Sequence, residues 1–388
     1  MISNNARLHV VDALRGFALV SIMLLHNLEH FDYYFAPLNR PDWMIPIDKG
    51  IWDSMFFLFG GKSYAIFALL FGLTFFIQSN NQKSMGKDFR WRFAWRLLLL
   101  LFFGLINSAF YQGDILTIYA IIGFFLIPFV NLSNKTVLVI AIVLMLQPYE
   151  WLNFFNAIHA PDIKPANPLS GSYFSKMENY IPFNSFTNTI IGNLTNGRPA
   201  VFLWSWENGR VFQTLSLFLL GMLAGRTSLF VISDKTRYFW SKVLVISVVL
   251  FIPLFLLKSK LGGLIGNETI SRPLLTIVKS WSNLSFMLIL VSGFVLLYQT
   301  LVFHKVLNAF SSIGRMSLSN YILQSILGSF IYYGFGLGLY KYTGATYCLF
   351  IGIVLAILQG AFSWWWIKKH QQGPLETIWH KLTWISLK

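Results

Sequence analysis

The feature that most constrains this chain is a series of apolar segments, each long enough to cross a lipid bilayer. A membrane-spanning helix needs about 20 mostly apolar residues, and ten segments of the sequence meet that requirement. Because lipid offers no partners for backbone N–H and C=O groups, these segments are expected to be helices. We therefore predict an all-α fold, a polytopic integral membrane helical bundle forming one transmembrane domain over residues 1–388. The predicted spans are 10–28, 52–78, 95–112, 114–131, 135–152, 209–226, 240–257, 279–302, 315–338 and 344–367.

The basic residues predict the orientation of the bundle. Only 12% of the residues are charged and the formal net charge is +15, whereas a soluble protein has roughly 25% charged residues. The basic excess is therefore interpreted as topology, and no nucleic acid partner is expected. With a cytoplasmic N-terminus, sixteen Lys and Arg residues fall on the cytoplasmic side and ten on the other. The positive-inside rule then places both the N- and C-termini in the cytoplasm.

Two segments outside the predicted spans have distinct compositions. Residues 153–208 are rich in Asn, Pro, Gly and aromatic residues, and they form a long extracytoplasmic loop in this topology. A loop of this length is expected to cover or bind something. Residues 371–388 have the pattern of a cytoplasmic amphipathic tail at the membrane surface, although a frayed terminal helix is the alternative.

The first span contains two residues that can take part in binding or catalysis, Arg15 and His26, and Asn27 follows them. Ionisable residues in a bilayer are costly, so each is a candidate functional residue. His26 lies eleven positions after Arg15, which corresponds to about 16 Å along the helix on a similar face. Arginine binds phosphate in a bidentate manner, and a neutral imidazole accepts a proton from a hydroxyl. The same segment also fits the zinc-protease pattern H-x-x-E-H, but no third ligand is evident and we predict no metal.

Two further candidates lie near glycines. The pair Gly60-Gly61 is expected to break the second span, which leaves Lys62 free to bind a phosphate or carboxylate or, alternatively, to reach the membrane surface. Asp114 follows a tight turn. It is either the N-cap of the next helix or a carboxylate that orients His26.

A polar stripe begins the ninth span. Arg315 precedes Ser317, Asn320, Tyr321 and Gln324, which recur at helical spacing. Such a stripe either holds helices together or lines a substrate tunnel, and the spacing alone does not separate these interpretations.

Several of these segments together resemble the YeiB-type family of bacterial inner-membrane proteins, whose function is poorly defined. The resemblance runs in order along nearly the whole chain, except for the 153–208 loop. It is carried by the segments 12–19, 61–62 with 67–72, 113–116 with Tyr119, 218–222, 314–324, and 373–376 before Trp379.

That family is similar to transmembrane acyltransferases, including the type 3 sugar O-acyltransferases and the lysosomal heparan glucosaminide N-acetyltransferase. The type 3 enzymes share one more feature with this chain, an arginine and a histidine separated by ten residues, here Arg15 and His26. YeiB-type proteins usually have asparagine where His26 stands. The resemblance implies an acyl-CoA donor from the cytoplasm and an acceptor hydroxyl or amine on the outer side.

The leading hypothesis is therefore an acyltransferase of the bacterial inner membrane. His26 would be the general base, oriented by Asp114, while Arg15, Lys62 and Arg315 would bind the donor. The acceptor would be a periplasmic glycan or a lipid-linked sugar. The alternatives are a transporter or flippase without covalent chemistry, and a scaffold whose charges are all mutually paired. A homodimer is left open.

Overall fold

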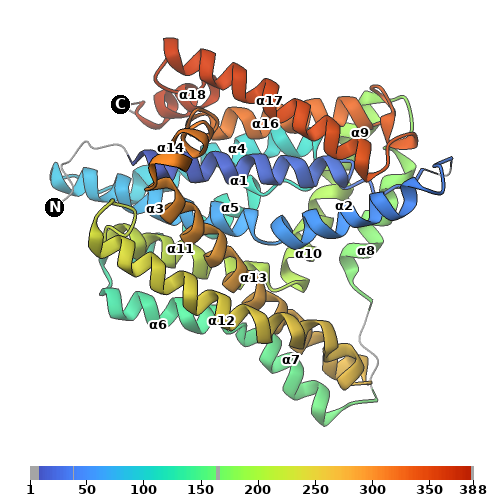
Figure 1. Cartoon of the computed structure of the whole chain (residues 1–388), viewed down its shortest axis with the longest axis horizontal. Helices are drawn as coiled ribbons and strands as arrows, with labels where there is room; N and C mark the ends of the chain where they lie inside the picture. The colour runs from blue at the N-terminus through green and yellow to red at the C-terminus, as the bar shows by residue number, and fades with distance from the viewer. Residues whose placement is uncertain (1–7, 38, 163–166, 386–388) are drawn as a thin grey trace.

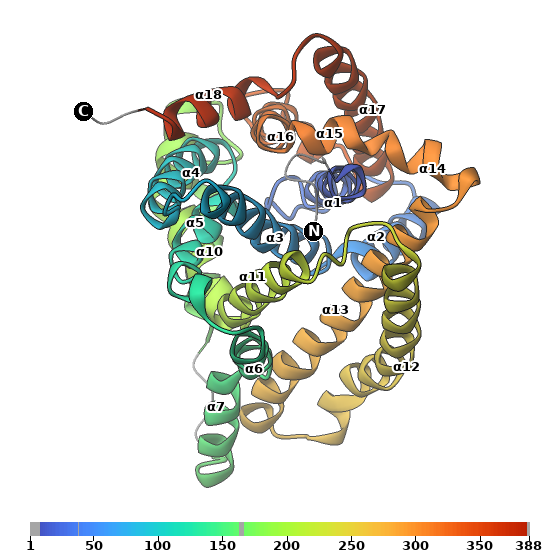
Figure 2. The same cartoon turned by 90° about the vertical axis from the view of Figure 1, so that its left-hand side faces the viewer.

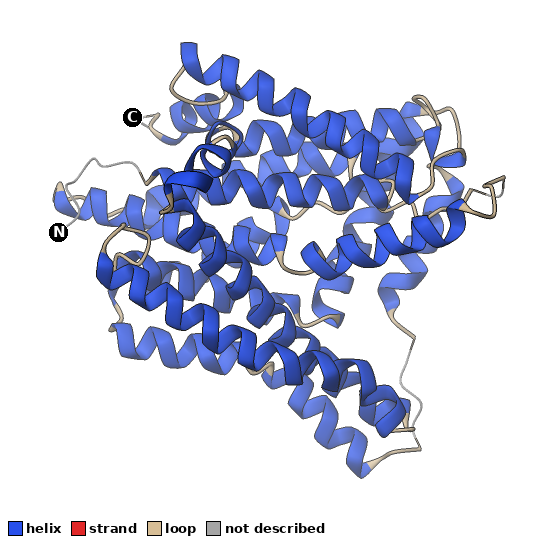
Figure 3. Ribbon diagram, viewed as in Figure 1, coloured by secondary structure: helices blue, strands red, loops and turns tan. Residues whose placement is uncertain are grey.

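The structure is a computed structural model that describes residues 8–37, 39–162 and 167–385. Within these residues every regular element is a helix (Figure 3), as the predicted fold class requires. Seven helices or helix pairs of the described chain are long and apolar enough to cross a membrane. They are α1 (His9–Leu28), α2 (Met44–Phe59) with α3 (Ser63–Ser84), α4 (Arg90–Phe110), α6 (Asn134–Met145) with α7 (Pro148–His159), α12 (Asp234–Leu264), α13 (Glu268–Tyr298) and α17 (Ala345–Lys369).

Three of the ten predicted spans contain shorter helices. Helix α5 (Leu116–Phe124) has 9 residues, α11 (Arg210–Arg226) has 17 and α16 (Ser317–Tyr332) has 16. At 1.5 Å per residue they extend about 14–26 Å, which is less than the hydrocarbon core of about 30 Å. The remaining short elements are η1 (Ile127–Asn131), α8 (Leu169–Phe174), η2 (Ser175–Asn179), α9 (Phe186–Gly192), η3 (Asn193–Gly197), α10 (Arg198–Glu207), α14 (Leu301–Asn308), α15 (Phe310–Arg315), η4 (Leu339–Lys341) and α18 (Pro374–Thr383).

Helix α1 occupies the centre of the bundle. It packs against α3, α15, α16 and α17, and Figure 2 shows it end-on among these helices while α12 and α13 extend away from it. In Figure 1, the start of α1 and helix α18 lie at the same end of the molecule. Residues along the whole length of α1 therefore lie in the interior of the bundle.

Glycine permits the closest helix contacts in the bundle. A Cβ atom at Gly16 would overlap the carbonyl oxygen of Phe310, and one at Gly314 would overlap that of Asp12, so α1 and α15 meet backbone to backbone. The same relation holds for Gly72 of α3 and the carbonyl of Phe218 in α11. Small residues at helix crossings are the usual means of dense packing in lipid, where the hydrophobic effect does not drive helices together.

The segment 153–208, which we predicted as a loop, is largely helical. It comprises the end of α7 and the elements α8 to α10, which pack on one another and on α4 and α11. Because the backbone groups of a buried connection need partners, short helices satisfy them where an irregular loop would not.

The C-terminal tail is docked onto the bundle. Helix α18 packs against α4 and α16. The carboxylate of Glu376 accepts hydrogen bonds from the backbone N–H groups of Leu318 (2.6 Å) and Ser319 (3.1 Å). These are two of the N–H groups that the start of α16 leaves without intrahelical partners. Glu376 therefore caps α16 from a distant part of the sequence; residues 386–388 lie outside the described chain.

The glycine contact between α1 and α15 makes a direct prediction. Gly16→Ala should lower the stability of the detergent-solubilised protein by about 1–3 kcal/mol, because the added methyl group forces the two helix backbones apart. The measurement is thermal unfolding of the purified protein. Gly293→Ala in α13 is the control, since a Cβ there meets no atom within 4 Å. Equal melting temperatures for the two variants would contradict the close contact.

Candidate functional site

The last turn of α1 places His26 at the edge of a large cavity. This cavity has a volume of about 1090 Å³ and is lined by His26, Lys62, Tyr111, Arg210 and Lys279, among others. Its size is at the upper end of the usual range for small-molecule sites, roughly 300–1000 Å³. We call it the large cavity.

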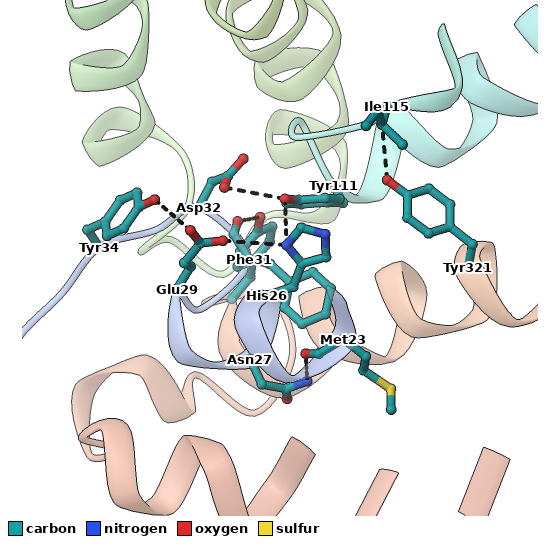
Figure 4. Close-up of polar contacts among 11 residues, drawn as sticks. Met23, His26, Asn27, Glu29, Phe31, Asp32, Tyr34, Tyr111, Ile115 and Tyr321 are labelled. Carbon is teal, nitrogen blue, oxygen red and sulfur yellow. Dashed lines mark hydrogen bonds and ion pairs between the residues drawn. The ribbon is translucent and has the colours of Figure 1, made fainter. Parts of the chain in front are cut away.

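His26 is held through one ring nitrogen. The Nδ1 atom lies 2.9 Å from the hydroxyl of Tyr111 and 3.4 Å from Oε2 of Glu29 (Figure 4). The Tyr111 hydroxyl in turn donates to Oδ1 of Asp32 at 3.3 Å. Each hydrogen bond in this series has a donor and an acceptor when Nδ1 carries the proton and donates to the Tyr111 hydroxyl. The Nε2 atom has no hydrogen-bond partner among the described residues and is then the basic nitrogen, as in a carboxylate-oriented catalytic histidine.

The backbone after α1 is strained in a way that brings Asp32 back to Tyr111, whereas Glu29 reaches His26 directly from the end of α1. His30, Phe31 and Asp32 have positive φ angles of 46°, 55° and 70°, which cost non-glycine residues roughly 1–2 kcal/mol each. Surrounding hydrogen bonds hold this turn: Tyr333 donates to the Phe31 carbonyl at 2.6 Å, and Phe31 N–H donates to the His26 carbonyl at 2.7 Å. Strain of this kind persists where the surroundings enforce it, which is typical of functional sites.

The second histidine of the H-x-x-E-H pattern has a different role. The Nε2 atom of His30 lies 2.9 Å from the carbonyl oxygen and 3.1 Å from the hydroxyl of Thr343. It therefore ties the strained turn to the start of α17. In the described part of the chain, no group of three or more His, Cys, Asp and Glu side chains is placed to hold a metal ion.

The surroundings of Asp32 and Tyr111 alter the pKa values of these two groups. Burial, reinforced by the charge of Glu29, raises the pKa of Asp32 well above its usual range, although the hydrogen bond from Tyr111 acts in the opposite direction. Burial and the two nearby carboxylates likewise raise the pKa of Tyr111, so its hydroxyl stays protonated. The hydroxyl group beside His26 is thus the neutral phenol of Tyr111, and the Asp32 carboxyl behind it is shielded from solvent.

The predicted helix break is present at the wall of the large cavity. Helix α2 ends at Phe59, Gly61 has a φ of +78°, and α3 begins at Ser63. The buried side chain of Lys62 donates to the carbonyls of Phe57 (2.7 Å) and Phe56 (3.4 Å). The end of α2 leaves the Phe57 carbonyl without a backbone partner among the described residues, whereas the Phe56 carbonyl also accepts from the N–H of Gly60 at 3.0 Å. A cation at this end also complements the helix dipole.

A second, small cavity lies on the side of Arg15. It measures about 410 Å³ and is lined by Arg15, Arg96, Arg315 and Ser317. Arg15 contacts Asp12 (3.3 Å) and donates to the hydroxyl of Thr74 (3.0 Å), while Arg315 donates to the carbonyl of Gln371 (2.7 Å). Three cationic side chains therefore share one small cavity.

The two cavities meet at a thin layer of side chains. Ile22, Ile115 and Tyr321 line both of them. The hydroxyl of Tyr321 accepts a hydrogen bond from the N–H of Ile115 at 3.3 Å. Arg15 and Arg315 thus lie on one side of this layer, and His26 and Lys62 lie on the other.

Asp114 lines the large cavity but is not the residue that orients His26. Its carboxylate accepts hydrogen bonds from the Asn107 amide (2.9 Å) and from the N–H of Thr117 (2.8 Å). The second contact is a helix cap at the start of α5, which is the simpler of the two interpretations of the sequence. The contacts of His26 are with Tyr111 and Glu29 instead.

The remaining polar candidates fall outside both cavities. Asn27 receives a hydrogen bond from Tyr332 (3.0 Å) and donates to the Met23 carbonyl (2.8 Å). Asn320 donates to Ser363 (2.8 Å) and so links α16 to α17. Gln324 is fully buried, and its amide atoms have no hydrogen-bond partner among the described residues. Asn27 and Asn320 therefore hold helices together, as polar residues in membrane bundles commonly do.

Sequence reasoning missed three members of the site: Glu29, Asp32 and Tyr111. The i, i+3 spacing of His26 and Glu29 is a local signal for one of them. Asp32 requires the strained turn and Tyr111 lies 85 residues from His26, so neither contact has a local signature.

Comparison with known proteins supports the resemblance seen in the sequence. Residues 224–386 match the family described as "Protein of unknown function (DUF418)". The chain is 29% identical to "Uncharacterized protein YxaH" of Bacillus subtilis (strain 168), over 98% of this chain and 95% of that protein. It is 26% identical to "Uncharacterized protein YeiB" of Escherichia coli (strain K12), over 96% of this chain and 95% of that protein.

The similarities to YxaH and YeiB extend along nearly the whole chain and, with the family match over residues 224–386, support a YeiB-type family. A further relative, "Uncharacterized 39.9 kDa protein in amylase 3'region" of Bacillus acidopullulyticus, is 23% identical over 98% of this chain and 95% of that protein. The relatives are described as uncharacterised, so they assign no activity to the site.

The acidity of Asp32 predicts a pH-dependent stability. A carboxyl group whose pKa is raised on folding binds its proton more tightly in the folded state, so wild-type stability falls as the pH rises from about 4 toward the folded pKa. Asparagine carries no such charge. As the pH rises from 4 to 8, the free energy of unfolding of Asp32→Asn should therefore increase relative to that of the wild type. The increase is about 1.4 kcal/mol for each tenfold difference in the proton affinity of Asp32 between the folded and unfolded states.

Thermal unfolding of the purified protein across this pH range checks the prediction. Asp42→Asn, which alters an exposed side chain in the same connection, serves as the control. A constant difference between Asp32→Asn and the wild type at all pH values would show that the Asp32 carboxyl is not desolvated.

Proposed function

We propose that the protein is a membrane-embedded acyltransferase that moves an acyl group, in the first instance acetyl, from cytoplasmic acyl-CoA to an envelope hydroxyl or amine. The observation that carries this proposal is the state of His26. Its Nδ1 atom is held by Tyr111 and Glu29, while its Nε2 atom is unpartnered among the described residues, and its side chain lines a cavity. A histidine in this arrangement is equipped for general base catalysis.

The proposed chemistry at His26 is a direct transfer. The Nε2 atom removes the proton from the acceptor hydroxyl as its oxygen attacks the thioester carbonyl carbon. A new C–O bond forms, the C–S bond breaks, and the CoA thiolate leaves with the electron pair of that bond. The imidazolium then returns the proton to the thiolate, so the enzyme is regenerated and CoA leaves as the thiol. Glu29 and Asp32 act as positioning residues, the latter through Tyr111.

The small cavity is the proposed donor site. Arg15, Arg96 and Arg315 line it, and arginine is well suited to the phosphates of a CoA molecule. The acyl arm would pass Ile22, Ile115 and Tyr321, which line both cavities, to reach His26. Lys62 lies on the His26 side of this layer, so it has no role in donor binding in this proposal.

The proposed setting is the bacterial inner membrane, with both termini in the cytoplasm. The small cavity is lined by residues from the first half of α1 and from α18, and these lie at the same end of the bundle in Figure 1. The donor site would then face the cytoplasm, where acyl-CoA is made, and the large cavity would face the outer side. The ten-span topology counts three further crossings that are shorter than the hydrocarbon core: α5 together with η1, α11 and α16.

Loss of the base tests the proposal. His26→Gln should reduce transfer of label from acetyl-CoA to envelope material in membranes by about 10²–10⁴-fold, because the attacking hydroxyl would keep its proton. Release of free CoA from the purified protein is the second readout.

The matched control is His159→Gln, which changes an exposed histidine at the end of α7. It should retain wild-type activity. Label transfer that is equal in the wild type and His26→Gln would exclude the acyltransferase function. In that case, movement of an unmodified substrate across vesicles containing the wild-type protein would favour the transporter alternative.

The donor site makes a separate kinetic prediction. Arg315→Gln should raise the KM for acyl-CoA by about tenfold while kcat changes little, because the lost contact is to the phosphates and not to the reacting atoms. Lys305→Gln, a change at an exposed residue of α14 outside the cavity, is the control. A fall in kcat at unchanged KM would argue against Arg315 as a donor-binding residue.

A further inference from the structure

One wall of the large cavity concentrates positive charge. Lys62, Arg210, Lys258 and Lys279 line it, from the α2–α3 break, α11, α12 and α13 respectively. None of these four forms a salt bridge with a described residue, and their charges repel one another. The guanidinium of Arg210 instead lies over the rings of Tyr64 (4.1 Å) and Trp204 (4.2 Å).

The carboxylates that line the same cavity form no salt bridge with these four cations among the described residues; they are Glu29, Asp32, Asp53, Asp114, Glu178 and Glu207. Glu29 contacts His26 and Tyr34, and Asp32 accepts from Tyr111. Glu207 accepts hydrogen bonds from the backbone N–H and the hydroxyl of Ser170. Gathering four cations with no anionic partner is unfavourable unless a ligand supplies negative charge.

The start of α3 adds a second, independent feature at this wall. Helix α3 has 22 residues and no side chain caps its N-terminus. Its first residue, Ser63, is 1% exposed and lines the large cavity, and its hydroxyl has no hydrogen-bond partner among the described residues. An uncapped helix N-terminus carries free N–H groups and a positive dipole end, both of which favour a phosphate.

We propose that the large cavity binds a phosphate-bearing ligand, with its phosphate at the start of α3. Lys62, Lys258, Lys279 and Arg210 neutralise the phosphate, and the Ser63 hydroxyl donates to it. The opposite end of the ligand extends toward His26, which lines the same cavity. That this ligand is the acyl acceptor rests on the proposed function, whereas the phosphate site itself does not.

The surroundings of the cationic wall favour a phosphate attached to an apolar chain. Phe57 lies 5.5 Å from Phe255 and 5.1 Å from Phe286, measured between ring centroids. Only 11% of the most apolar stretch of α12 is buried inside the protein, so most of this helix is available to lipid. A lipid-linked phosphate would place its head on the cations and its chain along these rings. A soluble phosphate monoester would use the cations alone.

The binding experiment uses the full chain in phosphatidylcholine nanodiscs at pH 7. Inorganic phosphate, glucose 1-phosphate and a polyisoprenyl phosphate are titrated separately, and binding is followed by the rise in melting temperature and by tryptophan fluorescence. Saturable binding of the polyisoprenyl phosphate alone identifies a lipid-linked ligand. Comparable binding of glucose 1-phosphate identifies a soluble one. Absence of saturable binding by all three probes overturns the proposal.

The variants compare two lysines on one helix. Lys258→Gln removes a charge from the cavity wall, whereas Lys260→Gln removes an exposed charge two residues further along α12, outside the cavity. Lys258→Gln should weaken binding of the phosphate probe by about tenfold or more, and Lys260→Gln should leave it unchanged. Ser63→Ala should also weaken it, and Lys258→Arg should preserve it. Equal affinities for Lys258→Gln, Ser63→Ala and the wild type would overturn the site even if all variants fold normally.

His26→Gln separates this inference from the proposed function. The variant should still bind inorganic phosphate saturably, because the proposed phosphate contacts are made by Ser63 and the four cations and not by His26. Phosphate binding without any His26-dependent acyl transfer would retain the site and reject the enzyme. Acyl transfer that proceeds equally well to acceptors lacking a phosphate would retain the enzyme and reject the phosphate-bearing ligand as its acceptor, while the binding titrations alone decide whether the phosphate site exists.

Discussion

The rest of the structure depends on the backbone contact between α1 and α15 at Gly16 and Gly314. In lipid, helices are held together by close packing and by hydrogen bonds, because the surrounding chains are as apolar as the side chains. This contact places α1 in the middle of the bundle, where most of its residues are buried. The first and second halves of α1 then place Arg15 and His26 at two neighbouring cavities. Without that central position, both would be charged or polar groups facing lipid.

Polar residues of the bundle divide into two kinds. Asn27 and Asn320 bond across helices to Tyr332 and Ser363, and their burial is compensated by those contacts. Lys62 bonds to the carbonyls at the end of α2, but it also lines a cavity wall with three further basic side chains. The first kind stabilises the bundle, and we propose that the second kind binds a phosphate-bearing ligand. Residue type alone does not separate them, since both kinds occur at helical spacing in apolar segments.

Much of the architecture was predictable because membrane insertion imposes simple rules. Length and apolarity locate the helices, and the pair Gly60-Gly61 marks a break that the structure contains. The predictions were weaker where helices are short or buried by protein. Helix α5 has 9 residues, yet the apolar pattern around it resembles a full span. The segment 153–208 was expected to be a loop because it lacks long apolar runs, but contacts with α4 and α11 stabilise short helices there.

The sequence by itself determined that this is an all-helical membrane protein, similar to YeiB-type proteins, with a histidine and an arginine on one helix. These properties follow from composition and from spacing along a single helix, which are local. Only the tertiary structure decided which groups meet His26. Tyr111 and the strained turn at Asp32 reach it through contacts between distant segments, whereas Asp114 caps α5. The tertiary fold also gathered Lys62, Arg210, Lys258 and Lys279 at one cavity, because helices separated by many residues pack side by side and no periodicity within one helix records that.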